Sequence, residues 1–487
     1  MAEHRYLALD LGAESGRGIV ATLAGGKISA EEIHRWPNKP VRMAGTLHWD
    51  VPYLFGEILQ AIRICAEKKI PIESISVDTW GVDFGLLDRD GKLIGNPVNY
   101  RDGRTDGIHE YSDPIMSRRE IYELTAYEPW QIASLFQLLS LKRDDSPQLA
   151  IAEGFLNMPD LMHYFLTGRR VSEMSIANTS NLMSTSCTWC RPIIERFGLK
   201  AEMFARLVPS ATVIGPLSDE VCQETGIGDV PVVATCGHDT SGAVAAVPGE
   251  GSNWAFLSCG TWSIIGTLLD APIPTGRALE MGFTNEYTIG GWYLARNISG
   301  LWLVQELRRK WDTASDPWDY NRMTAEAGGA PSGTLVNVAD DSLLAPDDME
   351  EALRKLIADS GQPDPTSRGE LIRIVLDSLA LEYNLRLDMV ADLQGHKPEA
   401  LYIVGGGIHN KLLCQLTANA CGLDVYAGAD QCTSMGNALG QALAMGHLDS
   451  PQAIRDVMRN SVDVTHYTPQ DADDWADRRD AYAKLVS

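Results

Sequence analysis

The chain has 487 residues, of which 45% are hydrophobic and 22% charged, a globular composition that is neither disordered nor fibrous and whose length suits two or three domains. Asp and Glu outnumber Lys and Arg by 65 to 41, which gives a net charge of -24. This acidity argues against general binding of nucleic acid or of an anionic membrane, because both need a basic face.

The first part of the chain is rich in β-forming runs. They predict strands at residues 6–10, 18–23, 27–36, 72–78 and 84–88, a glycine turn at 25–26 and a helix at 51–68. The chain start lacks the basic region, apolar stretch and cleavage site of a signal peptide. No stretch has the length of an apolar membrane span. We therefore expect a cytoplasmic protein with reduced cysteines.

The remainder mixes strands and helices, which indicates α/β architecture. Residues 115–170 are helix-rich, and the later pattern predicts strands at 229–235, 254–258, 264–269 and 400–404 and helices at 240–247, at about 370–395, up to 421 and, as the last element, at about 434–446. The second half opens with a strand, a turn and a strand, as the first half does, which is weak support for an internal duplication. Residues 248–251 look like a hinge, so we predict two domains, 1–247 and 248–487.

Two turns have the composition of phosphate-binding loops. Residues 10–17, Asp-Leu-Gly-Ala-Glu-Ser-Gly-Arg, offer backbone N–H groups, a hydroxyl and a guanidinium between two strands. Asp10 could hold a metal ion through water, since Mg²⁺ usually keeps several of its waters. Residues 258–263, Ser-Cys-Gly-Thr-Trp-Ser, form a second such turn. An ordinary hairpin is the alternative for each of them.

Residues 403–410, Ile-Val-Gly-Gly-Gly-Ile-His-Asn, are the most specific local signal. An apolar strand ends in three glycines and a helix follows. Glycines let the backbone lie against a flat ring or a phosphate without interference from Cβ atoms. A tight strand–helix turn with no ligand is the alternative.

Asp239 stands where a predicted strand meets a predicted helix, in the sequence His238-Asp239-Thr240. Phosphoryl transfer to a hydroxyl needs a carboxylate that accepts the hydroxyl proton, and the end of a strand suits such a group. Helix capping by Asp explains the same position equally well.

Three further segments carry weaker signals. Trp80 and Gly81, in the turn at 78–83, could contact a sugar, although a core tryptophan beside a turn glycine is the more ordinary interpretation. The turn at 100–105 offers two cations and a carboxylate, as a surface ion-pair cluster also would. Cys187 and Cys190 form the one CxxC pair, which we interpret as inert because a second ligand pair and a redox context are missing.

In this order the segments resemble the FGGY-type carbohydrate kinases of the actin/hexokinase-like ATPase superfamily. The resemblance extends over nearly the whole chain, at residues 10–17, 49–51, 78–84, 100–102, 238–240, 258–263, 297–302, 403–410 and 433–437. It implies an α/β fold of two ribonuclease-H-like (actin-like ATPase) domains with an active-site cleft between them. The N-terminal domain would bind the sugar and carry the catalytic base, and the C-terminal domain would bind the nucleotide.

The resemblance also implies roles for individual residues, with ATP and Mg²⁺ as cofactors. Asp239 would be the catalytic base, and Asp10 would hold the metal through water. The sugar site would be lined by Gly81, His238, Asp239, Thr240 and Asn297. The ATP site would be formed by Ala13, Glu14, Ser15, Gly16, Arg17, Thr261, Gln305, Gly406 and Asn410.

The expected reaction is phosphorylation of a keto sugar, L-rhamnulose to L-rhamnulose 1-phosphate, with L-fuculose or xylulose as alternative acceptors. A non-catalytic actin-like ATPase or regulator is the remote alternative. The sequence departs from the family pattern at Glu14, Gly237 and Cys259, where serine is usual. We expect small-molecule partners only, no nucleic acid and no membrane, in a monomer or small homo-oligomer.

Overall fold

A computed structural model describes residues 3–486 as two compact units. The first unit comprises residues 3–246, Leu269–Leu294 and Gln431–Ser461. The second unit comprises Val247–Leu268, Ala295–Asp430 and residues 462–486. Two segments from the second half of the chain, Leu269–Leu294 and Gln431–Ser461, therefore pack with the first unit. The sequence-based division into 1–247 and 248–487 stays a prediction about domain function.

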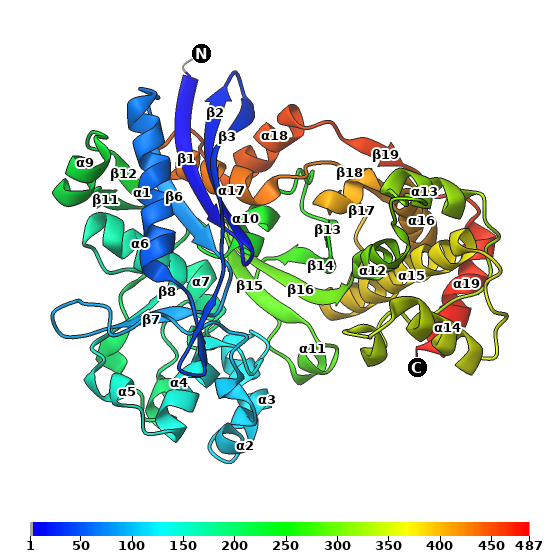
Figure 1. The fold of residues 1–487 in the computed structure, drawn as a ribbon, viewed down its shortest axis with the longest axis horizontal. Coiled ribbons are helices and arrows are strands. Elements are labelled where there is room, and N and C mark those ends of the chain that lie inside the picture. Colours follow the sequence, from blue (N-terminus) through cyan, green and yellow to red (C-terminus); the bar gives the residue numbers. More distant parts are fainter. Residues whose placement is uncertain (1–2, 487) are drawn as a thin grey trace. The chain divides into compact units, whose positions relative to one another are not determined.

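The first unit is built on a six-stranded sheet (Figure 1). Its strand order is β11 (Thr212–Pro216), β12 (Pro231–Ala234), β6 (Ser74–Thr79), β1 (Glu3–Leu11), β2 (Ser15–Ala24) and β3 (Lys27–Pro37). Strands β1, β2 and β3 form an antiparallel meander. Strand β6 runs parallel to β1, and β12 runs parallel to β6.

The sheet of the second unit repeats this arrangement. This sheet has seven strands; β15 (Thr284–Thr288) is at its edge, and the order continues as β16 (Gly291–Ser299), β14 (Trp262–Leu269), β13 (Trp254–Cys259), β17 (Ala400–Val404), β18 (Asp424–Ala427) and β19 (Thr465–Tyr467). Strand β13 is antiparallel to β14 and parallel to β17, and β17 is parallel to β18. The two units thus share one topology, which is the duplication that the sequence only suggested.

Alternation along β1 decides what each face of the first sheet carries. Leu7, Leu9 and Leu11 join one apolar core with α1 (Val51–Glu67) and α6 (Met158–Thr167). Because successive side chains in a strand point to opposite faces, Tyr6, Ala8 and Asp10 face the other way. Helix α17 (Cys432–Ala444) packs against β1 and β6, and Ser434 on this helix bonds to Asp10.

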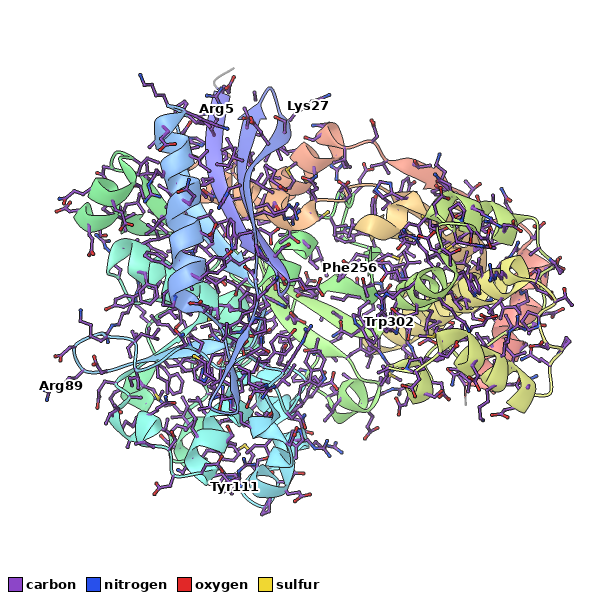
Figure 2. The ribbon with its side chains drawn as sticks, in the orientation of Figure 1. Arg5, Lys27, Arg89, Tyr111, Phe256 and Trp302 are labelled. Carbon is purple, nitrogen blue, oxygen red and sulfur yellow. The ribbon has the colours of Figure 1, made fainter. Side chains whose placement is uncertain are left out.

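Shorter elements complete the first unit. They are the strands β4 (Val41–Met43), β5 (Thr46–His48), β7 (Phe84–Leu87), β8 (Gly154–Asn157), β9 (Ser172–Glu173), β10 (Leu207–Val208) and β15 (Thr284–Thr288), and the helices α2 (Ile108–Ser112), α3 (Arg118–Thr125), α4 (Ser134–Arg143), α5 (Pro147–Ile151), α7 (Met174–Asn178), α8 (Arg191–Arg196), α9 (Asp219–Thr225), α10 (Asp239–Ala245), α11 (Gly276–Glu280) and α18 (Pro451–Ser461). The loop after β7 extends from the body of this unit, with Arg89 at its tip (Figure 2).

Helices surround the 27-residue helix α15 (Arg368–Gln394) in the second unit. They are α12 (Trp302–Trp311), α13 (Tyr320–Gly328), α14 (Met349–Asp359), α16 (Lys411–Cys421) and α19 (Ala472–Leu485). Seventeen residues of α15 are buried, so it forms the centre of this core.

The prediction that the helix at 434–446 is the last one is wrong, because α18 and α19 follow it. Helix α18 buries Ile454, Val457 and Met458, which share one helical face. Helix α19 buries only Trp475 and Tyr482 in a charged segment, so its apolar periodicity is weak.

No helix among residues 3–486 combines the length and apolar character that a membrane span requires. All nine cysteines are free thiols. Burial raises the pKa of the Cys187 and Cys190 thiols, which is opposite to what a reactive or metal-binding pair needs.

Candidate active site

Three acidic residues lie at the carboxyl ends of neighbouring parallel strands of the first unit, two within β1 and β6 and one in the segment that follows β12. Asp10 on β1 and Asp78 on β6 are direct partners in the strand register. His238 follows β12 and pairs with Thr79, and the Thr79 N–H donates to the Gly237 carbonyl at 2.9 Å. Asp239 comes next. Ligands of α/β sheets bind outside the carboxyl ends of such strands, so this edge is the candidate site.

Helix α17 holds the first two carboxylates in place. Asp10 Oδ2 accepts from Arg17 Nη2 at 2.5 Å and from Ser434 Oγ at 2.8 Å. Asp78 Oδ2 accepts from Asn437 Nδ2 at 2.6 Å. Asp78 Oδ1 is buried with no hydrogen-bond partner among residues 3–486. Burial raises the pKa of Asp78, and the Asp10 charge raises it further.

Asp239 is the first residue of α10, and its side chain is 28% exposed. Its Oδ1 accepts from the Thr240 N–H at 2.6 Å and from the Thr240 hydroxyl at 3.2 Å. Burial raises the pKa of Asp239 and the Asp10 charge adds to this, while His238 opposes it. The N-cap of α10 is His238, so capping, the alternative role that the sequence left open, does not account for Asp239.

His238 lies between two carboxylates. Its Nε2 is 3.5 Å from Asp239 Oδ1, and its Nδ1 is 3.0 Å from Glu286 Oε2. Glu286, on β15, also accepts from the Tyr293 hydroxyl at 2.7 Å. Burial lowers the pKa of His238, but the charges of Glu286 and Asp239 outweigh that effect and the net shift is upward. The two carboxylates therefore favour the protonated imidazole of His238 beside Asp239.

Glu173 fixes the strand end that carries His238. It is fully buried, and its carboxylate accepts from the Gly237 N–H at 2.9 Å, the Ser175 N–H at 2.9 Å and the Ser175 hydroxyl at 2.6 Å. The Ser175 hydroxyl accepts in turn from the His238 N–H at 3.2 Å. A Cβ at Gly237 would lie 3.1 Å from Glu173 Oε2, so the glycine that departs from the family pattern leaves room for this contact.

The predicted phosphate turn forms a closed bend at Ala13–Ser15. The Gly12 N–H donates to the Ser15 carbonyl at 3.0 Å, and Asn38 Nδ2 donates to the Gly12 carbonyl at 2.6 Å. Glu14 is exposed, and Ala13 and Ser15 are half-buried. Gly16 is buried under Trp36, whose indole would lie 2.2 Å from a Cβ at that position. Hydrogen bonds thus fix the backbone of the turn, while residues Ala13, Glu14 and Ser15 remain accessible to a ligand.

Gly81, predicted for the sugar site, lies half-buried against Thr179, 3.2 Å from where a Cβ would be. Its neighbour Trp80 is 5% exposed and stacks on Trp49 with ring centroids 3.9 Å apart. Asp83 Oδ2 accepts from both indoles, at 2.6 Å from Trp49 Nε1 and 2.9 Å from Trp80 Nε1. Trp80 is therefore a core residue, the ordinary interpretation that the sequence left open.

In the second unit, two residues predicted for ATP come together. The Thr261 hydroxyl donates to Gln305 Oε1 at 3.2 Å. The Leu301 N–H donates to the Gly260 carbonyl at 2.9 Å, and the Trp302 N–H donates to the Thr261 carbonyl at 2.9 Å. These bonds attach the start of α12 to the β13–β14 turn, which brings Gln305 beside Thr261.

The three glycines after β17 have different surroundings. A Cβ at Gly405 would lie 3.0 Å from the Cys259 carbonyl, and one at Gly407 would lie 2.2 Å from Cys259 Sγ. A Cβ at Gly406 would meet no atom within 4 Å, and this residue is exposed. Two of the glycines are therefore required by packing, while the open backbone of Gly406 can accept a ligand.

Asn410 and Asn297 also belong to the second unit. Asn410 caps α16, because its side chain accepts from the Leu413 N–H at 3.0 Å. Asn297 is exposed on β16 and stays a prediction for the sugar site. Sequence reasoning assigned no role to Asp78, Glu173, Glu286, Ser434 or Asn437, although 78–84 and 433–437 were among the segments that carried the resemblance.

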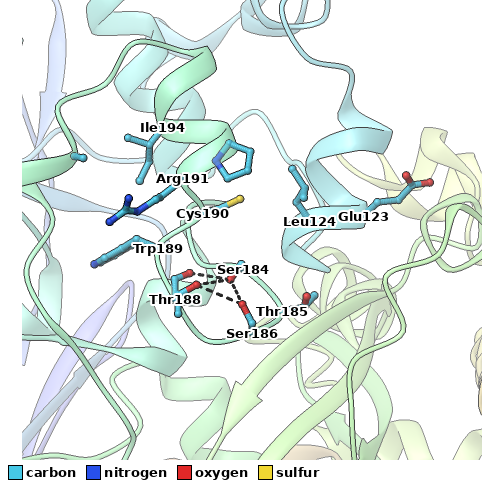
Figure 3. A pocket seen from close by; sticks show the side chains of 12 residues that line it. Glu123, Leu124, Ser184, Thr185, Ser186, Thr188, Trp189, Cys190, Arg191 and Ile194 are labelled. Atoms are coloured by element: carbon cyan, nitrogen blue, oxygen red, sulfur yellow. Dashed lines mark hydrogen bonds between the residues drawn. The ribbon is translucent and has the colours of Figure 1, made fainter.

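A separate pocket of ≈ 700 Å³ lies elsewhere in the first unit and contains none of the predicted site residues (Figure 3). The hydroxyls of Ser184, Ser186 and Thr188 bond to one another on its wall, between Trp189 and Glu123. These groups satisfy each other, so the pocket does not compete with the carboxylate site for the chemistry.

Comparison with known proteins agrees with this geometry. Residues 5–246 match the N-terminal domain, and residues 255–445 the C-terminal domain, of the FGGY family of carbohydrate kinases. The chain belongs to this family and is a sugar kinase that uses ATP. It is 39% identical to a rhamnulokinase from Bacteroides thetaiotaomicron, covering 97% of each chain, and 34% identical to one from Oceanobacillus iheyensis, covering 95% of this chain and 97% of the other.

Solved structures confirm the predicted fold class. A xylulose kinase from Rhodospirillum rubrum superposes with a TM-score of 0.83 at 16% identity, covering 99% of this chain and 98% of that one. A glycerol kinase from Plasmodium falciparum gives 0.82 at 16% identity, with 99% and 97% covered. At these identities the likeness establishes the α/β fold of two actin-like ATPase domains.

Proposed function

We propose that the enzyme transfers the γ-phosphoryl group of ATP to the C1 hydroxyl of L-rhamnulose, with Asp239 as the catalytic base. The observation that carries the proposal is the position of Asp239, at a strand end beside Asp10 and Asp78. The rhamnulokinases that match at 32–39% identity over nearly the full chain support the choice of sugar.

Asp239 would accept the proton of the sugar hydroxyl while the hydroxyl oxygen attacks the γ-phosphorus in line. Its raised pKa makes the carboxylate a stronger base than an exposed aspartate. Thr240 and His238 contact Oδ1 of Asp239. We therefore propose its other oxygen, Oδ2, as the proton acceptor. Gly81, His238 and Thr240, with Asn297 of the second unit, would orient the sugar.

The carboxylates of this site suit a hard divalent cation. The charge of Asp10 raises the pKa of both Asp78 and Asp239, so the three carboxylates lie within electrostatic reach of one another. A buried oxygen of Asp78 has no hydrogen-bond partner among the described residues. Mg²⁺ prefers oxygen ligands and keeps several waters, so Asp10 and Asp78 would hold it through water or directly. Bound there, it would neutralise charge on the phosphates.

Within the first unit, the N–H groups and hydroxyl at 13–16 and the guanidinium of Arg17 would bind the phosphates of ATP. In the second unit, the phosphates would also contact Thr261, and the adenosine would lie by Gln305, Gly406 and Asn410. This divides the roles as the sequence predicted, with sugar and catalysis assigned to 1–247 and the nucleotide mainly to 248–487. We further propose a cytoplasmic location, and a monomer or small homo-oligomer.

A coupled assay of ADP release tests the proposal. The purified enzyme with Mg²⁺ and ATP would be measured without sugar and with L-rhamnulose, L-fuculose, D-xylulose or glycerol. We expect L-rhamnulose to give the highest kcat/KM, by at least roughly tenfold, since a site that pairs the hydroxyls of one sugar rejects analogues that leave its polar groups unpaired. A higher kcat/KM for another sugar would refute the assignment of the acceptor and keep the kinase.

A further inference from the structure

A second cluster of ligand-type side chains lies at the opposite end of β1 from Asp10. His4 is on β1, Glu73 directly precedes β6, and His447 follows α17. His4 Nδ1 is 2.8 Å from Glu73 Oε1, and His447 Nε2 is 3.3 Å from Glu73 Oε2. One nitrogen or oxygen atom from each of the three residues lies within 4.8 Å of the other two, close enough to share one metal ion.

The cluster is distinct from the nucleotide site. His4 and Asp10 lie on the same face of β1, because they are an even number of residues apart. At about 3.3 Å per residue, the six steps between them span about 20 Å. An ion bound at His4 therefore cannot take part in the chemistry at Asp10.

Backbone and side-chain hydrogen bonds fix the elements that carry the cluster. The Glu73 N–H donates to the Arg5 carbonyl at 2.8 Å, which ties Glu73 to β1. The His447 N–H donates to the Ala442 carbonyl at 2.9 Å, at the end of α17. The cluster is thus held by the fold rather than by chance contact of long side chains. Figure 2 labels Arg5, which follows His4 on β1. The guanidinium of Arg5 pairs with Glu3.

Tyr6 gives His447 the partner that a ligand histidine usually has. Its hydroxyl lies 2.6 Å from His447 Nδ1, and Tyr6 is itself fully buried. Histidines that bind metals commonly donate their other ring N–H to an oxygen, which fixes the tautomer. If Nδ1 donates to the Tyr6 hydroxyl, Nε2 carries the lone pair and can bind an ion that lies between it and Glu73.

The two imidazoles stack, with centroids 3.7 Å apart and planes at 22°. The side chains of His4, Glu73 and His447 are 25%, 34% and 20% exposed, so an ion can reach them from solvent. Binding would tilt the rings apart, because each nitrogen must direct its lone pair at one common point.

We propose that His4, Glu73 and His447 bind a late first-row divalent cation, Zn²⁺ in particular, with water completing the coordination. Two imidazoles and one carboxylate suit Zn²⁺, Ni²⁺ or Cu²⁺, whereas Mg²⁺ requires oxygen ligands. The ion would tie together β1, β6 and α17, the three elements that hold Asp10 and Asp78 at their other ends. It is a structural ion that stabilises the framework of the catalytic site.

Metal titration of the untagged full-length enzyme tests the proposal. After removal of metals, Zn²⁺ binding would be measured by calorimetry and Co²⁺ binding by visible absorption, with thermal unfolding followed in parallel. We expect one site of micromolar affinity or tighter, a rise of Tm on addition of Zn²⁺, and a Co²⁺ spectrum without thiolate charge-transfer bands. Thiolate bands would place the ion on cysteines and overturn the proposal.

Three variants decide which residues bind. Glu73→Gln keeps the shape of the side chain and should weaken Zn²⁺ roughly 100-fold, and His4→Ala should do the same. Glu57→Gln is the matched control, because Glu57 also bonds to a histidine, His34, at 2.6 Å in a pair that no third ligand-type residue among residues 3–486 joins. Unchanged affinity in Glu73→Gln would overturn the proposal even if His4→Ala does not fold. Equal loss in Glu57→Gln would do so as well.

Discussion

Asp10 and Asp78 are register partners on the parallel strands β1 and β6, and both are nearly buried, at 4% and 1% exposure. Two carboxylates in this position repel each other, which contributes to the raised pKa of Asp78. Arg17 pairs with Asp10, while the amide of Asn437 is the partner of Asp78. The pair therefore carries more negative charge than its protein partners offset, and we assign the remaining compensation to Mg²⁺.

The first prediction concerns Asp78→Asn. The amide oxygen can replace Asp78 Oδ2 as acceptor for Asn437, so the shape of the site should persist. Because burial and the Asp10 charge disfavour the ionised form of Asp78, removal of this charge should raise the free energy of unfolding at pH 7. Turnover should fall at least roughly tenfold and the Mg²⁺ requirement should increase. Denaturant unfolding and Mg²⁺ titration of the kinase assay measure both. A destabilised variant with unchanged Mg²⁺ dependence would contradict the interpretation.

The second prediction compares alanine at two adjacent glycines. Gly407→Ala places its Cβ 2.2 Å from Cys259 Sγ, so it should lower the free energy of unfolding by about 1–3 kcal/mol. Gly406→Ala meets no atom within 4 Å, so stability should change by under about 1 kcal/mol. If the adenosine lies against Gly406, this variant should nevertheless raise the KM for ATP. Thermal unfolding and ATP kinetics separate the two effects. An unchanged KM in Gly406→Ala would exclude the proposed contact.

The third prediction is a pH dependence of stability that arises from Asp83. Burial raises the pKa of Asp83 to about 6, although N–H donors from Trp49, Gln137 and Trp80 and the charge of Arg104 oppose the shift. A carboxyl with a raised folded-state pKa stabilises the fold most below its unfolded pKa of 3.8 and loses that contribution as the pH rises through about 6.

Asp83→Asn removes this titration. Between pH 4 and pH 7, the difference in unfolding free energy between wild type and variant should decrease by about 2 kcal/mol, since most of the shift of about two pKa units takes effect in this range. Urea unfolding at several pH values measures the difference, and other titrating groups cancel in it. A difference that does not vary with pH would contradict the assignment of the shift to Asp83.

Local patterns in the sequence predict five of the six strands of the first sheet, β1, β2, β3, β6 and β12. The alternation of Leu7, Leu9 and Leu11 and the turn at Gly25 and Gly26 are both local, and the structure has β1, β2 and β3 there. The two-domain α/β fold came from the order of motifs along the chain. Helix α19 was missed because its buried side chains, Trp475 and Tyr482, are separated by a strongly charged segment.

The site was harder to predict because its contacts join distant segments. Asp10 and Ser434 are 424 positions apart, and Asp78 and Asn437 are 359 apart. Each side chain looks ordinary in its own segment, as a strand aspartate or a helix amide. Only the register of β1 with β6, and the packing of α17 on both, brings them together. Glu173 was missed for the same reason, since its bond to Gly237 spans 64 positions.

The central claim is that Asp239 is the catalytic base, and the turnover of Asp239→Asn tests it most directly. The wild type and the variant would be compared in the coupled ADP-release assay at saturating L-rhamnulose and Mg²⁺-ATP, with ATP affinity and thermal unfolding measured on the same samples. We predict that kcat falls by roughly 10²–10⁴-fold while folding and ATP binding stay close to wild type. Near-wild-type kcat in a folded, ATP-binding variant would contradict the account.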